Sequence, residues 1–111
     1  MAGAALADGD AAKGEKTARM CLACHSLTGK TNKIGPYLVG VVGRPVATAE
    51  GYAYSDAMKT FGATGAKWDE ATLSKYLANP KELVPGNKMG FAGVKKDDQR
   101  ADLIAYLATL K

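Results

Sequence analysis

Apolar positions along this chain of 111 residues follow the period of an α-helix in several segments, and the two-residue alternation of a strand is negligible. The clearest helix is predicted from about residue 97 to residue 110, where acidic side chains stand at the start and an apolar stripe follows. That stripe consists of Leu103, Ile104, Leu107 and Leu110. The pattern predicts an all-α protein.

Two further helices are predicted upstream of that one. Residues 10–20 contain the helix formers Ala, Lys, Glu and Arg, although Gly14 interrupts them. Residues 70–78 follow Asp69, a residue type that caps helix N-termini. Pro80 should end this second helix, because the residue before a proline avoids the helical backbone.

The middle of the chain, residues 26–65, is punctuated by Gly and Pro and has little apolar period, although a short helix around residues 55–61 is compatible with it. The sequence contains no repeat and no interdomain linker, and its length fits one domain. We expect residues 9–111 to form that domain and residues 1–8 to be a flexible segment or a processing remnant of an export signal. No stretch approaches the ~20 apolar residues of a membrane span, so the protein is predicted to be soluble.

The candidate chemistry is concentrated in the run Cys21-Leu22-Ala23-Cys24-His25, which holds every Cys and His of the chain. A C-x-x-C-H run is the attachment signature of c-type haem. The two thiols add to the vinyl groups of the porphyrin, and the neighbouring imidazole reaches the iron. The run therefore predicts one haem c, covalently attached through two thioether bonds.

Three other uses of this motif fit less well. A thioredoxin-like redox pair lies in a βαβ context, which is absent here. A structural zinc site needs four Cys or His ligands, and the chain has no second pair. A disulfide across a two-residue gap in a helical stretch has poor geometry. A haem would also supply the core that so small a chain lacks.

A second His cannot bind the opposite face of the iron, since no other His exists, which leaves Met, Lys, Tyr, water or no ligand at all. Met20 is too close in sequence to His25 to reach the opposite face of the ring. Met58 lies in the possible short helix and could be ordinary packing. Met89 lies in residues 84–91, where a Pro fixes the backbone and glycines allow close approach to a flat cofactor. The spacing favours Met89 over Met58 and leaves both open.

Several short segments occur in a shared order and spacing with one known family. They are residues 9–16, the C-x-x-C-H run, residues 35–44, 51–57, Trp68, residues 76–81, 85–89, 91–96 and 103–107. In this order the chain resembles class I cytochrome c, meaning mitochondrial cytochrome c and its bacterial periplasmic counterparts of the c2 type. The resemblance implies short helices and Gly/Pro loops wrapped around the haem, with the first and last helices crossing at Gly14, Leu103 and Tyr106.

The resemblance also implies roles for individual residues. Met89 matches the sulfur ligand opposite His25, and Pro36 matches the residue whose carbonyl accepts the Nδ1–H of that His. Tyr76 matches a tyrosine whose hydroxyl contacts the Met sulfur. The implied cofactor-binding residues are Cys21, Cys24, Pro36, Arg44, Tyr54, Trp68, Tyr76 and Asn87, and the implied metal ligands are His25 and Met89.

Around the haem propionates the resemblance implies a polar group of Arg44, Tyr54 and Trp68, where donors and a positive charge would compensate carboxylates. Asn87 replaces the commoner Thr of the methionine loop, which leaves its hydrogen bond toward a propionate open.

Two axial ligands leave no open position for a substrate, so the sequence predicts outer-sphere electron transfer rather than an enzyme, with no catalytic residue. The resemblance implies a monomeric carrier between membrane redox complexes, from a quinol-oxidising cytochrome bc complex to a terminal oxidase, a photosynthetic reaction centre or another reductase. The alternatives are a haem-based ligand sensor or peroxidase-like enzyme with a displaceable Met ligand, and a thiol–disulfide oxidoreductase that uses free Cys21 and Cys24.

The net charge of +4 favours acidic partners. The lysines expected to form a basic face around the haem edge are Lys16, Lys33, Lys81, Lys88, Lys95 and Lys96. Nucleic acid is not an expected partner, because no basic stretch is interleaved with aromatic residues. We expect the protein in the bacterial periplasm, with the mitochondrial intermembrane space as the alternative.

Overall fold

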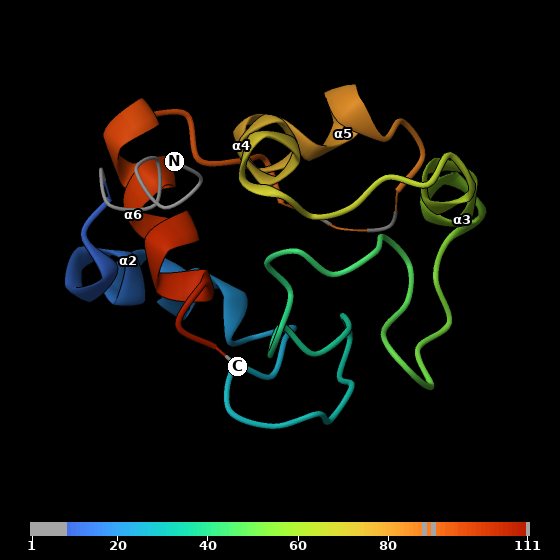
Figure 1. Ribbon diagram of the computed structural model, residues 1–111, viewed down its shortest axis with the longest axis horizontal. Helices are drawn as coiled ribbons and strands as arrows, with labels where there is room; N and C mark the ends of the chain where they lie inside the picture. Colours follow the sequence, from blue (N-terminus) through green and yellow to red (C-terminus); the bar gives the residue numbers. More distant parts are fainter. Residues whose placement is uncertain (1–8, 88, 90, 111) are drawn as a thin grey trace.

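The structure is a computed structural model that describes residues 9–87, 89 and 91–110, and its elements are helical (Figure 1). In chain order they are α2 (Ala11–Ala18), the 3₁₀ helix η1 (Arg19–Cys21), α3 (Asp56–Ala63), α4 (Glu70–Ala78), α5 (Pro80–Leu83) and α6 (Asp97–Leu107). Within this described part of the chain, strand-like pairing is limited to one isolated antiparallel bridge between Pro45 and Lys67. The prediction of an all-α protein is confirmed.

Helices α2, α3 and α4 begin at polar residues that cap them. The Asp10 carboxylate accepts hydrogen bonds from the first backbone N–H groups of α2. Oδ1 of Asp69 accepts from the N–H of Thr72 at 2.8 Å, which confirms it as the cap of α4. Ser55 caps α3 in the same way, which places a helix where the short one was possible. Each cap satisfies a donor that the helix itself leaves unpaired.

Two helix boundaries differ from the prediction. α4 stops before Pro80 as expected, but Pro80 then begins the short helix α5, with Asn79 as its cap. A proline suits the first position of a helix because its missing N–H would be unpaired there in any case. α6 ends at Leu107, earlier than the predicted residue 110.

Helices α2 and α6 cross on one side of the molecule, and α3 lies on the opposite side with α4 and α5 between them (Figure 1). At the crossing, a Cβ on Gly14 would lie 1.9 Å from the carbonyl oxygen of Asp102 and 2.9 Å from Cβ of Tyr106. Leu103 is fully buried beside this contact. The first and last helices therefore meet as the resemblance implies, and they do so because Gly14 has no side chain.

Two loop segments are drawn together by backbone hydrogen bonds between residues 43–46 and 66–68. The N–H of Trp68 donates to the carbonyl of Arg44 at 2.8 Å, and the N–H of Gly43 donates to the carbonyl of Trp68 at 2.7 Å. This pairing brings Arg44 and Trp68 together although many residues separate them in sequence. Within the residues described, no helix is long and apolar enough to span a bilayer.

Candidate functional site

The C-x-x-C-H run forms one compact turn that continues from η1. The N–H groups of Cys24 and His25 both donate to the carbonyl of Cys21, at 3.1 and 2.8 Å. Both thiols are half-buried. Burial, reinforced by the neighbouring Cys24, raises the pKa of the Cys21 thiol. A raised pKa is opposite to the activated thiolate that a thiol–disulfide oxidoreductase needs, so it counts against that alternative.

The imidazole of His25 is fixed by the next loop. Its Nδ1 lies 2.6 Å from the carbonyl oxygen of Pro36. Because a carbonyl can only accept, Nδ1 carries the proton and Nε2 keeps its lone pair. Gly35 packs against the ring, since a Cβ there would lie 2.4 Å from the His25 Cε1. This is the contact between His25 and Pro36 that the resemblance implies.

The electrostatic surroundings keep this imidazole neutral. Burial lowers the pKa of His25, and the positive charges of Arg44 and Lys33 lower it further, whereas the hydrogen bond to Pro36 acts in the opposite direction. A neutral imidazole with Nε2 unprotonated is the form that binds a metal.

Arg44, Trp68 and Tyr54 come from separate parts of the chain and form a polar region centred on Arg44, which is hydrogen-bonded to the Trp68 backbone and whose charge acts on the Tyr54 hydroxyl. Nη1 of Arg44 donates to the carbonyl of Tyr37 at 3.1 Å, and its guanidinium lies 5.1 Å from the centroid of the Tyr37 ring. The hydroxyl oxygen of Tyr54 accepts from the N–H of Ala49 at 2.9 Å, which leaves its own hydrogen available to donate. Burial raises the pKa of Tyr54, and the charge of Arg44 opposes that rise.

This polar region fits the carboxylates of a haem. Nε of Arg44 is buried without a hydrogen-bond partner, and no carboxylate within residues 9–87, 89 and 91–110 forms an ion pair with this side chain. A half-buried cation with a buried, unpaired donor favours a nearby anion. Two spaced thiols, a neutral imidazole and a thioether complete the donor set of a haem c. The residues present therefore fit that cofactor.

Met89 and Met58 are both half-buried and pack against the hydrophobic core. Tyr76, on α4, is buried with its ring centroid 4.9 Å from that of Trp68, and burial raises its pKa to about 12. In the part of the chain that is described, its hydroxyl makes no hydrogen bond to the sulfur of Met89. That contact stays a prediction, as does the choice of Met89 as ligand.

Asn87 lies in the loop that leads to Met89, and its side chain faces that loop. Nδ2 donates to the carbonyls of Pro80 and Val84, at 3.0 and 2.9 Å. An amide has two N–H hydrogens, so neither is left for a propionate. The role of Asn87 in binding the cofactor stays a prediction.

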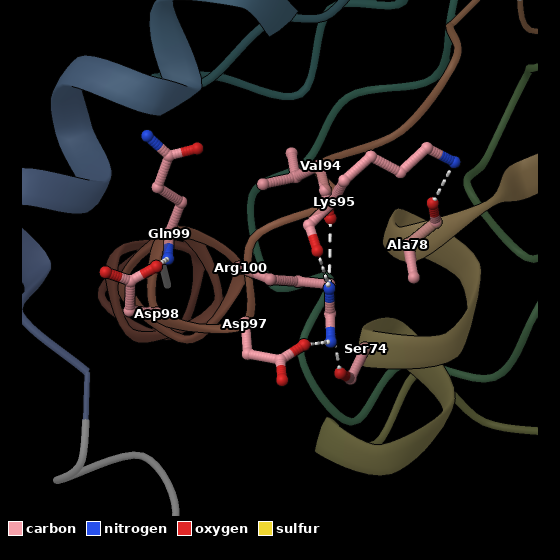
Figure 2. Close-up of polar contacts among 8 residues, drawn as sticks. All are labelled: Ser74, Ala78, Val94, Lys95, Asp97, Asp98, Gln99 and Arg100. Carbon is pink, nitrogen blue, oxygen red and sulfur yellow. Dashed lines mark hydrogen bonds and ion pairs between the residues drawn. The ribbon is translucent and has the colours of Figure 1, made fainter.

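The loop between α5 and α6, called the Met89 loop below, is held at its C-terminal end by contacts with α4 and α6. The N–H of Val94 donates to the carbonyl of Leu77 at 2.6 Å, and Nζ of Lys95 donates to the carbonyl of Ala78 at 2.7 Å. Figure 2 shows Arg100 reaching from α6 to the carbonyl of Val94 and to Ser74 on α4. Both ends of this loop are therefore anchored.

The described lysines of the predicted basic face are all exposed, and some of them also donate to backbone carbonyls. Lys33 and Lys81 each donate to a backbone carbonyl, of Leu22 at 2.7 Å and of Asn87 at 2.6 Å, as Lys95 also does. Lys16 and Lys96 are exposed. Lys88 lies outside the described residues.

Sequence reasoning gave no role to Tyr37, which is buried beneath the Arg44 guanidinium. Its backbone N–H donates to the Oδ1 of Asn32 at 3.2 Å, and Nδ2 of Asn32 reaches the carbonyl of Glu50 at 2.9 Å. These two residues hold the loops around Arg44. The only feature of the sequence that could have indicated a role for Tyr37 is its position directly after Pro36. The segment around it has no apolar period from which its burial could have been predicted.

Comparisons with known proteins identify the family of this chain. The profile of the family described as Cytochrome c matches residues 11–111. Cytochrome c2 of Rhodomicrobium vannielii is 51% identical over 107 residues, which are 95% of this chain and 82% of that protein. Cytochrome c of Chlamydomonas reinhardtii is 52% identical over 101 residues, covering 89% of this chain and 88% of that protein.

Among solved structures, cytochrome cH from Methylobacterium extorquens is similar with a TM-score of 0.83 at 48% identity, over 91% of this chain and 99% of that one. This likeness confirms the predicted class I fold. The chain therefore belongs to the cytochrome c family, carries one covalently attached haem c and functions in electron transfer.

Proposed function

We propose that this cytochrome carries single electrons between membrane redox complexes, with its iron held by His25 and Met89. The observation that carries the assignment is the 2.6 Å contact between Nδ1 of His25 and the carbonyl of Pro36, directly after two spaced cysteines. It leaves Nε2 as the one ring nitrogen that can bind iron. The donor would be a quinol-oxidising cytochrome bc complex, and the acceptor a terminal oxidase, a reaction centre or another reductase.

The chain's own residues set up this chemistry in separate ways. When bound, haem c supplies the Fe(II)/Fe(III) couple. Cys21 and Cys24 hold it covalently, and His25 offers a neutral nitrogen whose direction Pro36 fixes. Arg44 and Tyr54 offer N–H and O–H donors to its carboxylates. A thioether from Met89 favours the reduced state, and two protein ligands leave no position for a substrate. On this basis the protein is not an enzyme.

The exposed lysines support docking to acidic partners. A net charge of +4 steers encounter with an acidic surface, and exposed Lys16 and Lys96 are free to contribute to that field. Lys33, Lys81 and Lys95 keep their charge at the surface while they donate to carbonyls. We propose that these side chains form the docking face and that the protein acts as a monomer.

We also propose that the protein works in the bacterial periplasm. Covalent haem attachment in bacteria takes place outside the cytoplasmic membrane, and bacterial cytochromes of the c2 type are among its relatives. Osmotic-shock fractionation of the source cells should release the protein with periplasmic markers. Recovery with the cytoplasmic fraction would contradict this location.

The first test of the function is an optical spectrum of the purified holoprotein, oxidised and then reduced. We expect the weak band at the near-infrared edge that reports Met sulfur on Fe(III), and sharp low-spin bands after reduction. Met89→Ala should abolish the sulfur band and retain covalent haem, whereas Met58→Ala should leave the band in place. Loss of the band in Met58→Ala would overturn the ligand assignment, and its absence in the wild type would favour the ligand sensor or peroxidase-like enzyme.

A further inference from the structure

The carboxamide of Asn87 is buried in the loop that carries Met89, with the residue only 5% exposed. Its Nδ2 donates to the carbonyls of Pro80 and Val84. Its Oδ1 accepts from the backbone N–H of Met89 at 2.8 Å and lies 3.4 Å from Nζ of Lys81. One side chain thus joins α5, the turn that follows it and the backbone of the proposed iron ligand.

Every hydrogen-bonding position of this amide is used, and the partners allow one orientation. Pro80 and Val84 present carbonyl oxygens, which must face the two N–H hydrogens. Met89 and Lys81 present donors, which must face the oxygen. A flipped amide would set oxygen against two carbonyls and nitrogen against two donors, so the network itself fixes the side chain.

The carbonyls that Asn87 binds are also held by the backbone. The carbonyl of Pro80 accepts from the N–H of Val84 at 3.0 Å, and the carbonyl of Val84 accepts from the N–H of Asn87 at 3.2 Å. Nζ of Lys81 donates to the backbone carbonyl of Asn87 at 2.6 Å. Gly86 makes the turn with a φ of +88°. The loop is a closed set of hydrogen bonds with Asn87 at its centre.

We infer that Asn87 is a positioning residue for Met89: its buried carboxamide holds the backbone N–H of the ligand and thereby limits how often the sulfur leaves the iron. The inference rests on the proposed ligation by Met89. It gives Asn87 a role through the protein backbone in place of the expected bond to a propionate.

The chemistry of the site explains why an amide suits it. A Thr hydroxyl offers one hydrogen and cannot satisfy two carbonyls while it also accepts from Met89. An Ala side chain makes none of these hydrogen bonds, so the N–H of Met89 loses its acceptor and the two carbonyls keep only their backbone partners. The loop should therefore open more often with Thr than with Asn, and most often with Ala.

Imidazole provides a direct probe of loop opening, because it binds the oxidised iron only when the sulfur has left. The apparent dissociation constant then equals the intrinsic one divided by the open fraction. Titrations of the holoprotein, followed at the sulfur band, would compare wild type, Asn87→Thr, Asn87→Ala and Asp69→Ala. The last variant loses one helix cap on α4, away from the Met89 loop, and serves as the stability control.

We expect imidazole to bind Asn87→Ala at least tenfold more tightly than wild type, which corresponds to about 1.4 kcal/mol. Asn87→Thr should fall between the two, and it keeps the test open if the Ala variant fails to mature. Asp69→Ala should bind imidazole as wild type does, although urea unfolding should show it to be less stable.

Three results would overturn the inference. Unchanged imidazole affinity in both Asn87 variants, with the sulfur band present in wild type, would remove the role of Asn87 alone. An equal gain in affinity in Asp69→Ala for the same loss of global stability would show that Asn87 acts only on overall stability. A wild type without the sulfur band would remove Met89 as the ligand, and with it both proposals.

Discussion

At Gly35, the absence of a side chain lets the loop lie flat against the imidazole of His25. A Cβ there would lie 2.4 Å from Cε1 and 2.7 Å from Nδ1 of the ring, both inside contact distance. The neighbouring Pro36 carbonyl can then reach Nδ1. The direction in which Nε2 of His25 points therefore depends on the absence of a side chain at Gly35.

Gly35→Ala should therefore destabilise the holoprotein by about 1–3 kcal/mol, the usual range for an overpacked contact. Urea unfolding would measure the loss. Gly29→Ala is the matched control, because a Cβ at Gly29 meets nothing within 4 Å. Equal stability of the two variants would show that the imidazole can move aside.

At the scale of elements, helix propensity and packing have opposite preferences at the crossing of α2 and α6: propensity favours alanine at residue 14, and packing favours glycine. Alanine is about 1 kcal/mol better than glycine in a helix interior. At Gly14, however, a Cβ would lie 1.9 Å from the carbonyl oxygen of Asp102, which belongs to the backbone of α6 and cannot move alone. Packing should win here.

Gly14→Ala should lower the free energy of unfolding by about 1–3 kcal/mol, because the two helices must separate to admit the methyl group. Thermal or urea unfolding would show this. Ala12→Gly, at an exposed position of the same helix, should cost about 1 kcal/mol through propensity alone. A stabilised Gly14→Ala variant would contradict the close crossing.

The cap of α4 makes a pH-dependent contribution to stability. The hydrogen bonds from Thr72 lower the pKa of the exposed Asp69 carboxyl below its ordinary value of 3.8. Because the folded-state pKa is depressed, the stabilisation is present above that ordinary value and is lost as the pH falls through the folded-state pKa.

Asp69→Ala should lose about 1 kcal/mol of stability at neutral pH, and Asp69→Asn should lose less, because an amide oxygen can also cap. Urea titrations at several pH values would show the difference in free energy of unfolding between wild type and Asp69→Asn becoming smaller below about pH 4. A difference that is constant down to pH 2 would contradict a charged cap.

For the whole molecule, long loops are held by hydrogen bonds between distant residues. Pairing of residues 43–46 with 66–68 brings Arg44 to Trp68, and Arg100 joins α6 to α4 and to the Met89 loop (Figure 2). The same framework leaves Lys16 and Lys96 exposed. The positive charges of these lysines are thus available for docking, while the hydrogen bonds hold the loops in place.

Lys96→Glu changes the net charge from +4 to +2 and should slow electron transfer to an acidic partner several-fold at low ionic strength. Stopped-flow kinetics over a range of salt would measure this, and the difference should vanish near 1 M salt. Lys59→Glu makes the same charge change on α3, outside the proposed face. Equal slowing by both variants would mean that only net charge matters.

Much of the local structure could be predicted because its causes are close in sequence. Asp10 and Asp69 cap helices that start beside them, and Leu103, Ile104 and Leu107 are buried as the stripe predicts. The short helix α5 was missed because Pro80 reads equally as a stop and as a first position. In the structure the side chain of Asn79 caps α5, and this cap makes Pro80 the first residue of a helix.

The sequence by itself determined the covalent cofactor chemistry, since the cysteines and the histidine act within five neighbouring residues. It also determined the helices and the net charge, which depend on neighbouring residues and on composition. Tertiary structure decided the partners of side chains: Pro36 for His25, as the resemblance implies, Tyr37 for Arg44, and the carbonyls of Pro80 and Val84 for Asn87. The physical reason is that a hydrogen bond depends on atoms within about 3 Å, and chain folding alone brings distant residues that close.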